Sequence, residues 1–110
     1  MPRDYLTDFE LMLLLATLRV GEEAYGVPIA REIEAFGDRT VMLGAVYTGL
    51  DRLEANGLVS SSVGSSTPER GGRAKRYFRV TPSGMKAVRQ AKRAFTRLWS
   101  GVPGLEGGRT

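Results

Sequence analysis

"LGAVYTGLDRLEANGLV", residues 43–59, is the stretch that decides the fold of this chain. Apolar side chains recur every three or four positions, which predicts an α-helix within residues 40–57 that has one apolar stripe. The stripe consists of Leu43, Val46, Leu50 and Leu53. Gly57, directly after Asn56, is a helix stop signal. The opposite face is small, polar and nearly flat, and it carries Ala45, Thr48, Gly49 and Arg52.

A first helix is predicted over residues 6–20. Thr7 or Asp8 can cap its start, and Gly21 stops it. Its middle, residues 11–18, is apolar nearly all the way round. A surface helix of a monomer needs only one apolar stripe, so we expect a second face of this helix to meet another chain.

A second, short helix is predicted over residues 24–37, where Pro28 suits the first turn and Gly37 ends the helix. Its apolar stripe consists of Ile29, Ile33 and Phe36.

Residues 59–63 and 74–80 are β-type runs that are separated by a Gly/Ser/Pro-rich loop, a pattern typical of a long-looped hairpin. Thr81 then caps a last helix that Pro82 opens. One apolar seam follows that helix, and its other faces are basic. The seam consists of Met85, Val88, Ala91, Phe95, Leu98 and Trp99.

Three helices followed by a hairpin is the order of elements in a winged helix-turn-helix. The predicted fold is mainly α with a small two-stranded β-hairpin, the wing, and a long C-terminal dimerisation helix. We expect a winged helix-turn-helix domain in residues 1–80, the dimerisation helix in 81–100 and a flexible Gly-rich tail in 101–110. A recognition helix must enter a major groove about 12 Å wide, which explains the flat face of the third helix.

Composition excludes several classes of function. The 110 residues suffice for one domain, and they include neither Cys nor His. Disulfides, thiolate chemistry, the usual soft-metal sites and histidine acid–base catalysis are therefore excluded. We expect no enzyme, no cofactor and no metal, and a cytoplasmic protein that does not enter a membrane.

Charge divides the chain unevenly. Residues 1–69 hold five Arg against eleven acidic residues, a net charge of −6, whereas residues 70–97 hold ten Lys or Arg and no acid, a net charge of +10. This asymmetry favours a polyanion partner. For the basic helix of residues 86–97, a merely solvated surface remains an equal alternative.

The ordered motifs resemble the PadR family of bacterial transcriptional regulators, whose members carry G-x-x-Y-x-x-L-x-R-L-E-x-x-G-L followed by a basic, aromatic wing and a Thr-x-x-Gly turn. The matching residues of the third helix are Gly44, Tyr47, Leu50, Arg52, Leu53, Glu54, Gly57 and Leu58. Those of the wing and turn are Arg76, Tyr77, Thr81 and Gly84, and "YGVPIAREI" supplies Tyr25, Gly26 and Ile29. The likeness covers residues 5 to about 100 and corresponds to the short form of the family.

The resemblance implies a homodimeric repressor that binds double-stranded DNA. In such a dimer the last helix of each subunit packs against the first helix of its partner. Two such subunits would read a pseudo-palindromic operator with half-sites about one helical turn apart. Phe9, Met12, Phe95, Leu98 and Trp99 are the candidate dimer core. Alternatively, a dimer cavity lined by Phe9, Met12, Phe95 and Trp99 admits a flat aromatic effector.

The candidate major-groove residues are Thr40, Ala45, Thr48, Gly49 and Arg52. Arg52 can grip guanine with two hydrogen bonds, and its alternative role is an ion pair with Glu54 or Glu32. Asp51 places a negative charge close to this face. Gly49 weakens the helix by up to about 1 kcal/mol relative to Ala.

Candidate phosphate contacts come from the second and third helices and from the wing. Tyr25 and Tyr47 can bury their rings and extend their hydroxyl groups to a phosphate. The wing candidates are Arg70, Arg73, Lys75 and Arg76. Strand alternation places Phe78 and Val80 in the core, leaves Arg79 solvated and puts Arg76, as an exception, on the inward face.

Two other functions remain open at this point. A winged helix can serve as a protein-interaction module whose basic segment docks an acidic partner. It can also be a small-molecule binding protein for which DNA is secondary.

Overall fold

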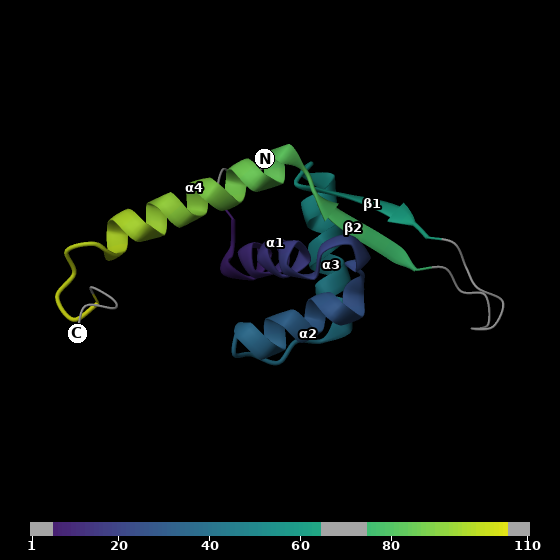
Figure 1. Ribbon diagram of the computed structural model, residues 1–110, viewed down its shortest axis with the longest axis horizontal. Coiled ribbons are helices and arrows are strands. Elements are labelled where there is room, and N and C mark those ends of the chain that lie inside the picture. The colour runs from purple at the N-terminus through teal and green to yellow at the C-terminus, as the bar shows by residue number, and fades with distance from the viewer. Residues whose placement is uncertain (1–5, 65–74, 106–110) are drawn as a thin grey trace.

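The computed structural model describes residues 6–64 and 75–105. Its helices are α1 (Asp8–Val20), the short 3-10 helix η1 (Gly21–Glu23), α2 (Gly26–Phe36), α3 (Leu43–Ala55) and α4 (Pro82–Trp99), and its strands are β1 (Val59–Val63) and β2 (Arg76–Val80). The first three α-helices pack together, the hairpin projects from one side, and α4 extends away on the other (Figure 1). This is the predicted winged-helix architecture. None of the helices in the described segments is both long and apolar enough to cross a bilayer.

The N-terminus of α1 is fixed by a capping box. The Thr7 hydroxyl accepts a hydrogen bond from the Glu10 amide at 3.1 Å, and the Glu10 carboxylate accepts one from the Thr7 amide at 2.9 Å. Thr7 is therefore the cap of the two candidates. Gly21 ends the helix with a φ of 86°, a conformation that favours glycine.

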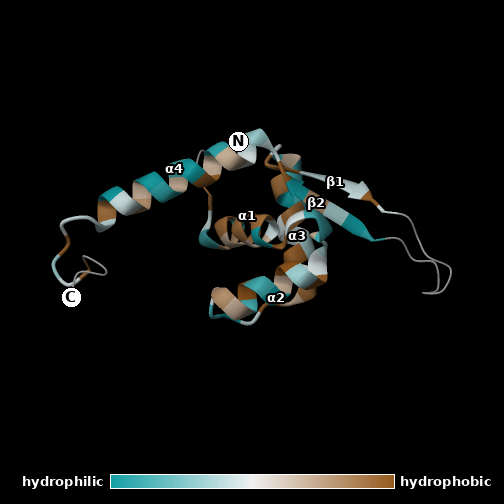
Figure 2. Ribbon diagram, viewed as in Figure 1, coloured by the Kyte–Doolittle hydropathy of each residue, from teal (hydrophilic) through white to brown (hydrophobic). Residues whose placement is uncertain are grey.

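The core lies where α1, α2 and α3 meet, and the hydrophobic colours of Figure 2 concentrate there. Its fully buried side chains are Leu13, Leu14, Ile29, Val46, Leu50 and Leu53. The hairpin joins this core through Phe78, which is buried and whose amide donates to the Ala24 carbonyl at 2.8 Å. Val59 is buried beside it, so the wing is anchored at its base by apolar packing.

Two members of the predicted apolar stripes are not in the core. Phe36 lies in the last turn of α2 and is 66% exposed, and the Arg19 guanidinium lies 3.8 Å from its ring centroid. Leu43 is exposed because it is the first residue of α3, one turn before the buried Val46. Both residues belong to the predicted stripes but lie at helix ends, where a stripe extends beyond the elements packed against it.

The hairpin pairs β1 and β2 antiparallel, with Val59 opposite Val80 and Ser61 opposite Phe78. β2 begins at Arg76, later than the predicted strand start. The predicted start, Ala74, lies outside the described residues.

Thr81 connects the start of α4 to the end of α3. Its hydroxyl accepts from the Gly84 amide at 3.0 Å, as predicted for a cap, and donates to the Gly57 carbonyl at 2.7 Å. Gly84 is buried against the Leu58 carbonyl, which a Cβ atom at residue 84 would contact at an impossible distance. The Thr-x-x-Gly turn therefore requires glycine for its close packing rather than for an unusual backbone angle.

Replacing Gly84 with alanine is expected to lower the free energy of unfolding by about 1–3 kcal/mol, because the Leu58 backbone and the Val80 side chain must move. Gly44→Ala is the matched control, since a Cβ atom there meets nothing within 4 Å and alanine favours the helix. Chemical denaturation at one protein concentration compares the two. Equal stability of Gly84→Ala and the unchanged protein would contradict this assignment.

Candidate nucleic-acid interface

The outward face of α3 is largely free of bulky side chains. It consists of Gly44, Ala45, Thr48, Asp51, Arg52 and Ala55, all exposed. The opposite face packs into the core through Val46, Leu50 and Leu53. Ala45, Thr48 and Arg52 therefore lie together on one accessible surface, as predicted.

Gly49 does not lie on that surface. It is buried, and a Cβ atom there would collide with Leu13 and would lie 3.4 Å from the Phe9 ring. The prediction that Gly49 lies opposite the apolar stripe was wrong, because the residue follows Val46 by three positions and precedes Leu53 by four, a spacing that places it among them. Its small size lets α1 and α3 approach closely.

Thr40 precedes α3 and is exposed in the segment that joins α2 to α3. Thr40 accordingly lies outside α3, at the approach to its N-terminus.

Arg52 is exposed, and no ion pair with it exists among the residues that the structure describes. Its two predicted partners are engaged elsewhere. Glu32 pairs with Arg19 at 2.6 Å, and Glu54 pairs with Arg76 at 2.6 Å. The alternative role of Arg52 as an ion-pair partner of either glutamate is thus wrong, and its guanidinium is accessible to a ligand.

Arg76 lies on the inward face of β2 and reaches α3. Its two terminal nitrogens lie 2.7 Å from the Asp51 carboxylate and 2.6 Å from the Glu54 carboxylate. Its Nε donates to the Ser61 hydroxyl at 3.3 Å, and the same hydroxyl donates to Glu54 at 2.8 Å. The sequence marked Arg76 as the exception to strand alternation, and this network explains the exception.

The network shifts the titration of two of its members. Hydrogen bonds from the Ser61 hydroxyl and the Arg76 guanidinium lower the pKa of Glu54 below its usual value. Burial acts to lower the pKa of Arg76, but the hydrogen bonds to Asp51 and Glu54 outweigh it and raise that pKa. Both groups are therefore held in their charged forms.

Tyr47 and Tyr25 lie near the N-terminus of α2. The Tyr47 hydroxyl accepts from the Gly26 amide at 3.2 Å, which leaves its own proton available to a further acceptor. A Cβ atom at residue 26 would overlap the Tyr47 ring, so only glycine permits this contact. The Tyr25 ring meets the Tyr77 ring edge-on at 5.8 Å, and the Lys75 ammonium lies 5.1 Å from the Tyr25 centroid.

Lys75 is thus beside Tyr25, one of the two candidate phosphate-binding tyrosines, whereas Arg76 points to α3. Arg70 and Arg73, the predicted wing-tip contacts, lie outside the described residues.

The residues of the predicted dimer core are not enclosed within one chain. Phe95, Leu98 and Trp99 are 54%, 72% and 54% exposed on α4. Phe9 and Met12 are partly buried on α1, where they pack against the hydrophobic core. These five residues consequently form no closed pocket in a single chain.

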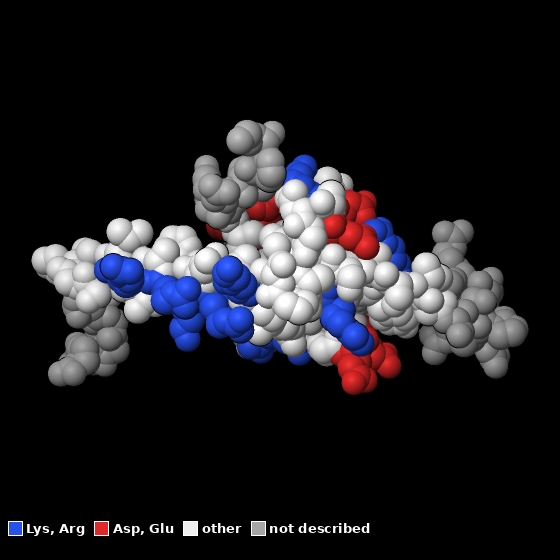
Figure 3. Space-filling view, turned by 90° about the horizontal axis from the view of Figure 1, so that it is seen from above, with Lys and Arg blue, Asp and Glu red and all other residues white. Residues whose placement is uncertain are grey.

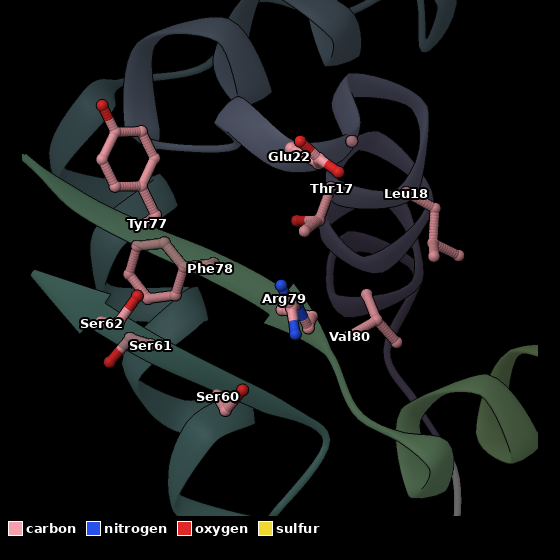
Figure 4. A pocket seen from close by; sticks show the side chains of 11 residues that line it. Thr17, Leu18, Glu22, Ser60, Ser61, Ser62, Tyr77, Phe78, Arg79 and Val80 are labelled. Atoms are coloured by element: carbon pink, nitrogen blue, oxygen red, sulfur yellow. The ribbon is translucent and has the colours of Figure 1, made fainter. Parts of the chain in front are cut away.

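A different pocket, of about 420 Å³, opens between the end of α1 and the hairpin (Figure 4). None of the five predicted dimer-core residues lines it. Its charged side chains are Glu22 and Arg79, and Ser60, Ser61 and Ser62 of β1 form one wall.

Exposed basic side chains form a row along α4 (Figure 3). The row consists of Lys86, Arg89, Arg93 and Arg97, whose spacing of three or four residues places them on one face. None of them pairs with an acidic side chain in the described part of the chain.

The three helices, the anchored hairpin and the flat outward face of α3 define a winged-helix protein. Residues 14–90 match the Transcriptional regulator PadR-like family. The chain belongs to this family of transcriptional regulators.

Individual relatives agree with this assignment. The chain is 37% identical over 76 residues to the transcriptional regulator Rv3488 of Mycobacterium tuberculosis, an alignment that covers 69% of this chain and 66% of that protein. It thus spans slightly less than two thirds of the relative's length. The complex structure of hsRosR-SG superposes with a TM-score of 0.67 at 29% identity, covering 92% of this chain and 81% of that one. A PadR family regulator from Eggerthella lenta shares the fold, with a TM-score of 0.65 at 22% identity over 79% and 73% of the two chains.

Acid is expected to weaken the wing through Glu54. A carboxylate whose pKa is lowered on folding stabilises the fold above its unfolded pKa, about 4.3, and loses that contribution as the pH falls through the lower folded value. Below about pH 4.3 the unfolding free energy should therefore fall more steeply for the unchanged protein than for Glu54→Gln.

Denaturant unfolding at several pH values measures this difference, and Glu23→Gln corrects for the loss of one exposed carboxylate. Parallel pH profiles for the unchanged protein and Glu54→Gln would show that Glu54 carries no such linkage.

Proposed function

We propose that this chain is a sequence-specific repressor that binds a pseudo-palindromic DNA operator as a homodimer. The observation that carries the proposal is the outward face of α3, where Ala45, Thr48 and Arg52 are exposed and Arg52 has no ion-pair partner in the described structure. Family membership supplies the regulatory class. The assignment as a sequence-specific repressor depends on the outward face of α3.

The chemistry of the face suits base recognition. An unpaired guanidinium donates two hydrogen bonds to guanine O6 and N7 in the major groove. Thr48, one turn from Arg52 on the same face, can contact a base or a phosphate, and Ala45 lets the helix approach closely. Thr40 lies where the chain enters α3 and can contact the backbone there.

The phosphate contacts come from two other regions. Tyr47 can donate its hydroxyl proton to a phosphate while it accepts from Gly26, and Tyr25 and Lys75 lie nearby. The N-terminus of α2, which Gly26 opens, adds the favourable dipole for an anion. Arg70 and Arg73 would extend these contacts from the wing.

Dimerisation joins two apolar surfaces that one chain leaves uncovered. One is the exposed part of the α4 seam, Phe95, Leu98 and Trp99, and the other is Leu15 and Leu18 on α1. In a twofold dimer each α4 can cover the α1 of its partner, so the same pair of surfaces is used twice. On this proposal residues 1–80 bind DNA and residues 81–100 hold the dimer together.

The dimer cavity between Phe9, Met12, Phe95 and Trp99 is the proposed place for a flat aromatic effector that changes the spacing of the two α3 helices. The regulator would act in the cytoplasm, where its operator is accessible.

DNA binding is tested by fluorescence anisotropy with the protein's own upstream region as duplex and random duplex as competitor. We expect specific binding whose logarithm of affinity falls linearly with the logarithm of salt concentration. Arg52→Ala should reduce the preference for the operator by about 1–3 kcal/mol and leave random-duplex binding nearly unchanged.

No preference of the unchanged protein over random DNA would overturn the repressor assignment. If Arg70→Glu with Arg73→Glu then abolished docking to an acidic protein, a protein-interaction module would be the better assignment. Binding of hydrophobic aromatics that quenches Trp99 fluorescence without DNA binding would favour a small-molecule binding protein.

The dimer is tested by Leu98→Asp, which places a charge on the apolar seam. Sedimentation equilibrium should show a dimer for the unchanged protein and a monomer for the variant, because burying an unpaired carboxylate is unfavourable. Arg97→Gln, next to it on the basic face, is the control and should remain dimeric. A dimeric Leu98→Asp would place the interface elsewhere.

A further inference from the structure

Arg76 connects three elements of the chain through one guanidinium. It extends from β2, binds Asp51 and Glu54 on α3 and donates to Ser61 on β1. The guanidinium carbon also lies 4.8 Å from the centroid of the Phe78 ring, which anchors the hairpin in the core. All three of its nitrogens are thus engaged within the protein.

Such a site holds the side chain in one position. The two charged contacts are short, at 2.7 Å and 2.6 Å, and Ser61 supports Glu54 through both its amide, at 3.1 Å, and its hydroxyl, at 2.8 Å. Charge-assisted hydrogen bonds of this kind are about twice as strong as neutral ones. A DNA phosphate that approached Arg76 would lie beside two carboxylates that already bind both terminal nitrogens, and these carboxylates would repel it.

The ion pairs of Arg76 change the charge of the surface of α3 that would face DNA. Asp51 is 58% exposed and lies on the same face of α3 as Thr48 and Arg52. An unpaired carboxylate there would repel the phosphate backbone. With Arg76 bound, the group Asp51, Glu54 and Arg76 carries a net charge of −1 instead of −2.

We propose that Arg76 is a positioning residue for DNA binding, which fixes the wing against α3 and neutralises Asp51 and does not itself contact phosphate. The proposal rests on the proposed function and assigns Arg76 a role different from that of a wing cation. Lysine cannot replace Arg76, because a single ammonium lacks the planar fork of N–H donors that reaches two carboxylates and the Ser61 hydroxyl at once.

The decisive experiment is a double-mutant cycle between Arg76 and Asp51, measured by anisotropy on the operator duplex over a series of salt concentrations. Arg76→Gln should weaken binding by roughly tenfold, and Arg76→Gln with Asp51→Asn should recover to within about threefold of the unchanged protein. The salt slope of Arg76→Gln should stay unchanged, whereas loss of one phosphate contact lowers it by about 0.9.

Arg79→Gln is the matched control for charge. Arg79 lies on the same strand, is exposed and has no ion pair in the described residues. Its loss removes the same charge without touching α3, so it should change the affinity less than Arg76→Gln does. Additive effects of the two substitutions at Arg76 and Asp51, or a salt slope reduced by about 0.9, would overturn the proposal and make Arg76 a phosphate contact.

A measurement without DNA separates this proposal from the repressor assignment. The Ser61 amide donates to Glu54, so its hydrogen exchange reports the link between wing and α3. Exchange should accelerate in Arg76→Gln and Arg76→Lys and stay unchanged in Arg79→Gln. If the unchanged protein shows no preference for the operator, the repressor assignment fails. The exchange data still test whether Arg76 links the wing to α3.

If Arg76→Gln does not fold, as judged by circular dichroism, Arg76→Lys decides the question. Loss of both Ser61 protection and DNA affinity in Arg76→Lys supports the proposal. Retention of both would overturn it, because a single ammonium would then suffice.

Discussion

The close contact between α1 and α3 at Gly49 determines which face of α3 points outward. Leu13 and Phe9 occupy the space that a side chain at residue 49 would need. Any larger residue would push α3 away or rotate it about its axis, and a rotation would turn Ala45, Thr48 and Arg52 together away from their outward direction. The outward surface is therefore a consequence of packing on the inward one, since interiors tolerate little change in volume.

The wing depends on the same core in a second step. Phe78 inserts its ring beside Tyr47, at 6.3 Å between centroids, and Tyr47 in turn fills the space left by Gly26. Arg76 and Thr81 then tie the two ends of β2 to α3, one by ion pairs and the other through Gly57. The hairpin is thereby fixed relative to α3 by apolar packing in its middle and by polar bonds at both ends.

Local signals in the sequence predicted most of the elements, because helix caps and apolar stripes depend on neighbours a few residues apart. Thr7, Gly21, Thr81 and the Val46–Leu50–Leu53 stripe are of this kind. The error at Gly49 was one of helical spacing, because its distances from Val46 and Leu53 already place it on their face of α3. Whether Glu54 binds Arg52 or Arg76 across 22 residues depends instead on how helix and strand pack, which spacing alone does not encode.

The cations of the chain consequently differ in what they can do. Arg76 offsets one of the two negative charges of Asp51 and Glu54, and Arg19 pairs with Glu32, so the positive charge available to a polyanion is smaller than the composition implies. The row from Lys86 to Arg97 lies on a different face of α4 from Phe95, Leu98 and Trp99. Dimerisation through the apolar seam would then leave that row in solvent, because burying one face of a helix does not require burying the other. The basic segment of residues 70–97 is thus divided between a wing that Arg76 fixes to α3 and a helix whose charges, in the proposed dimer, would lie outside the apolar seam.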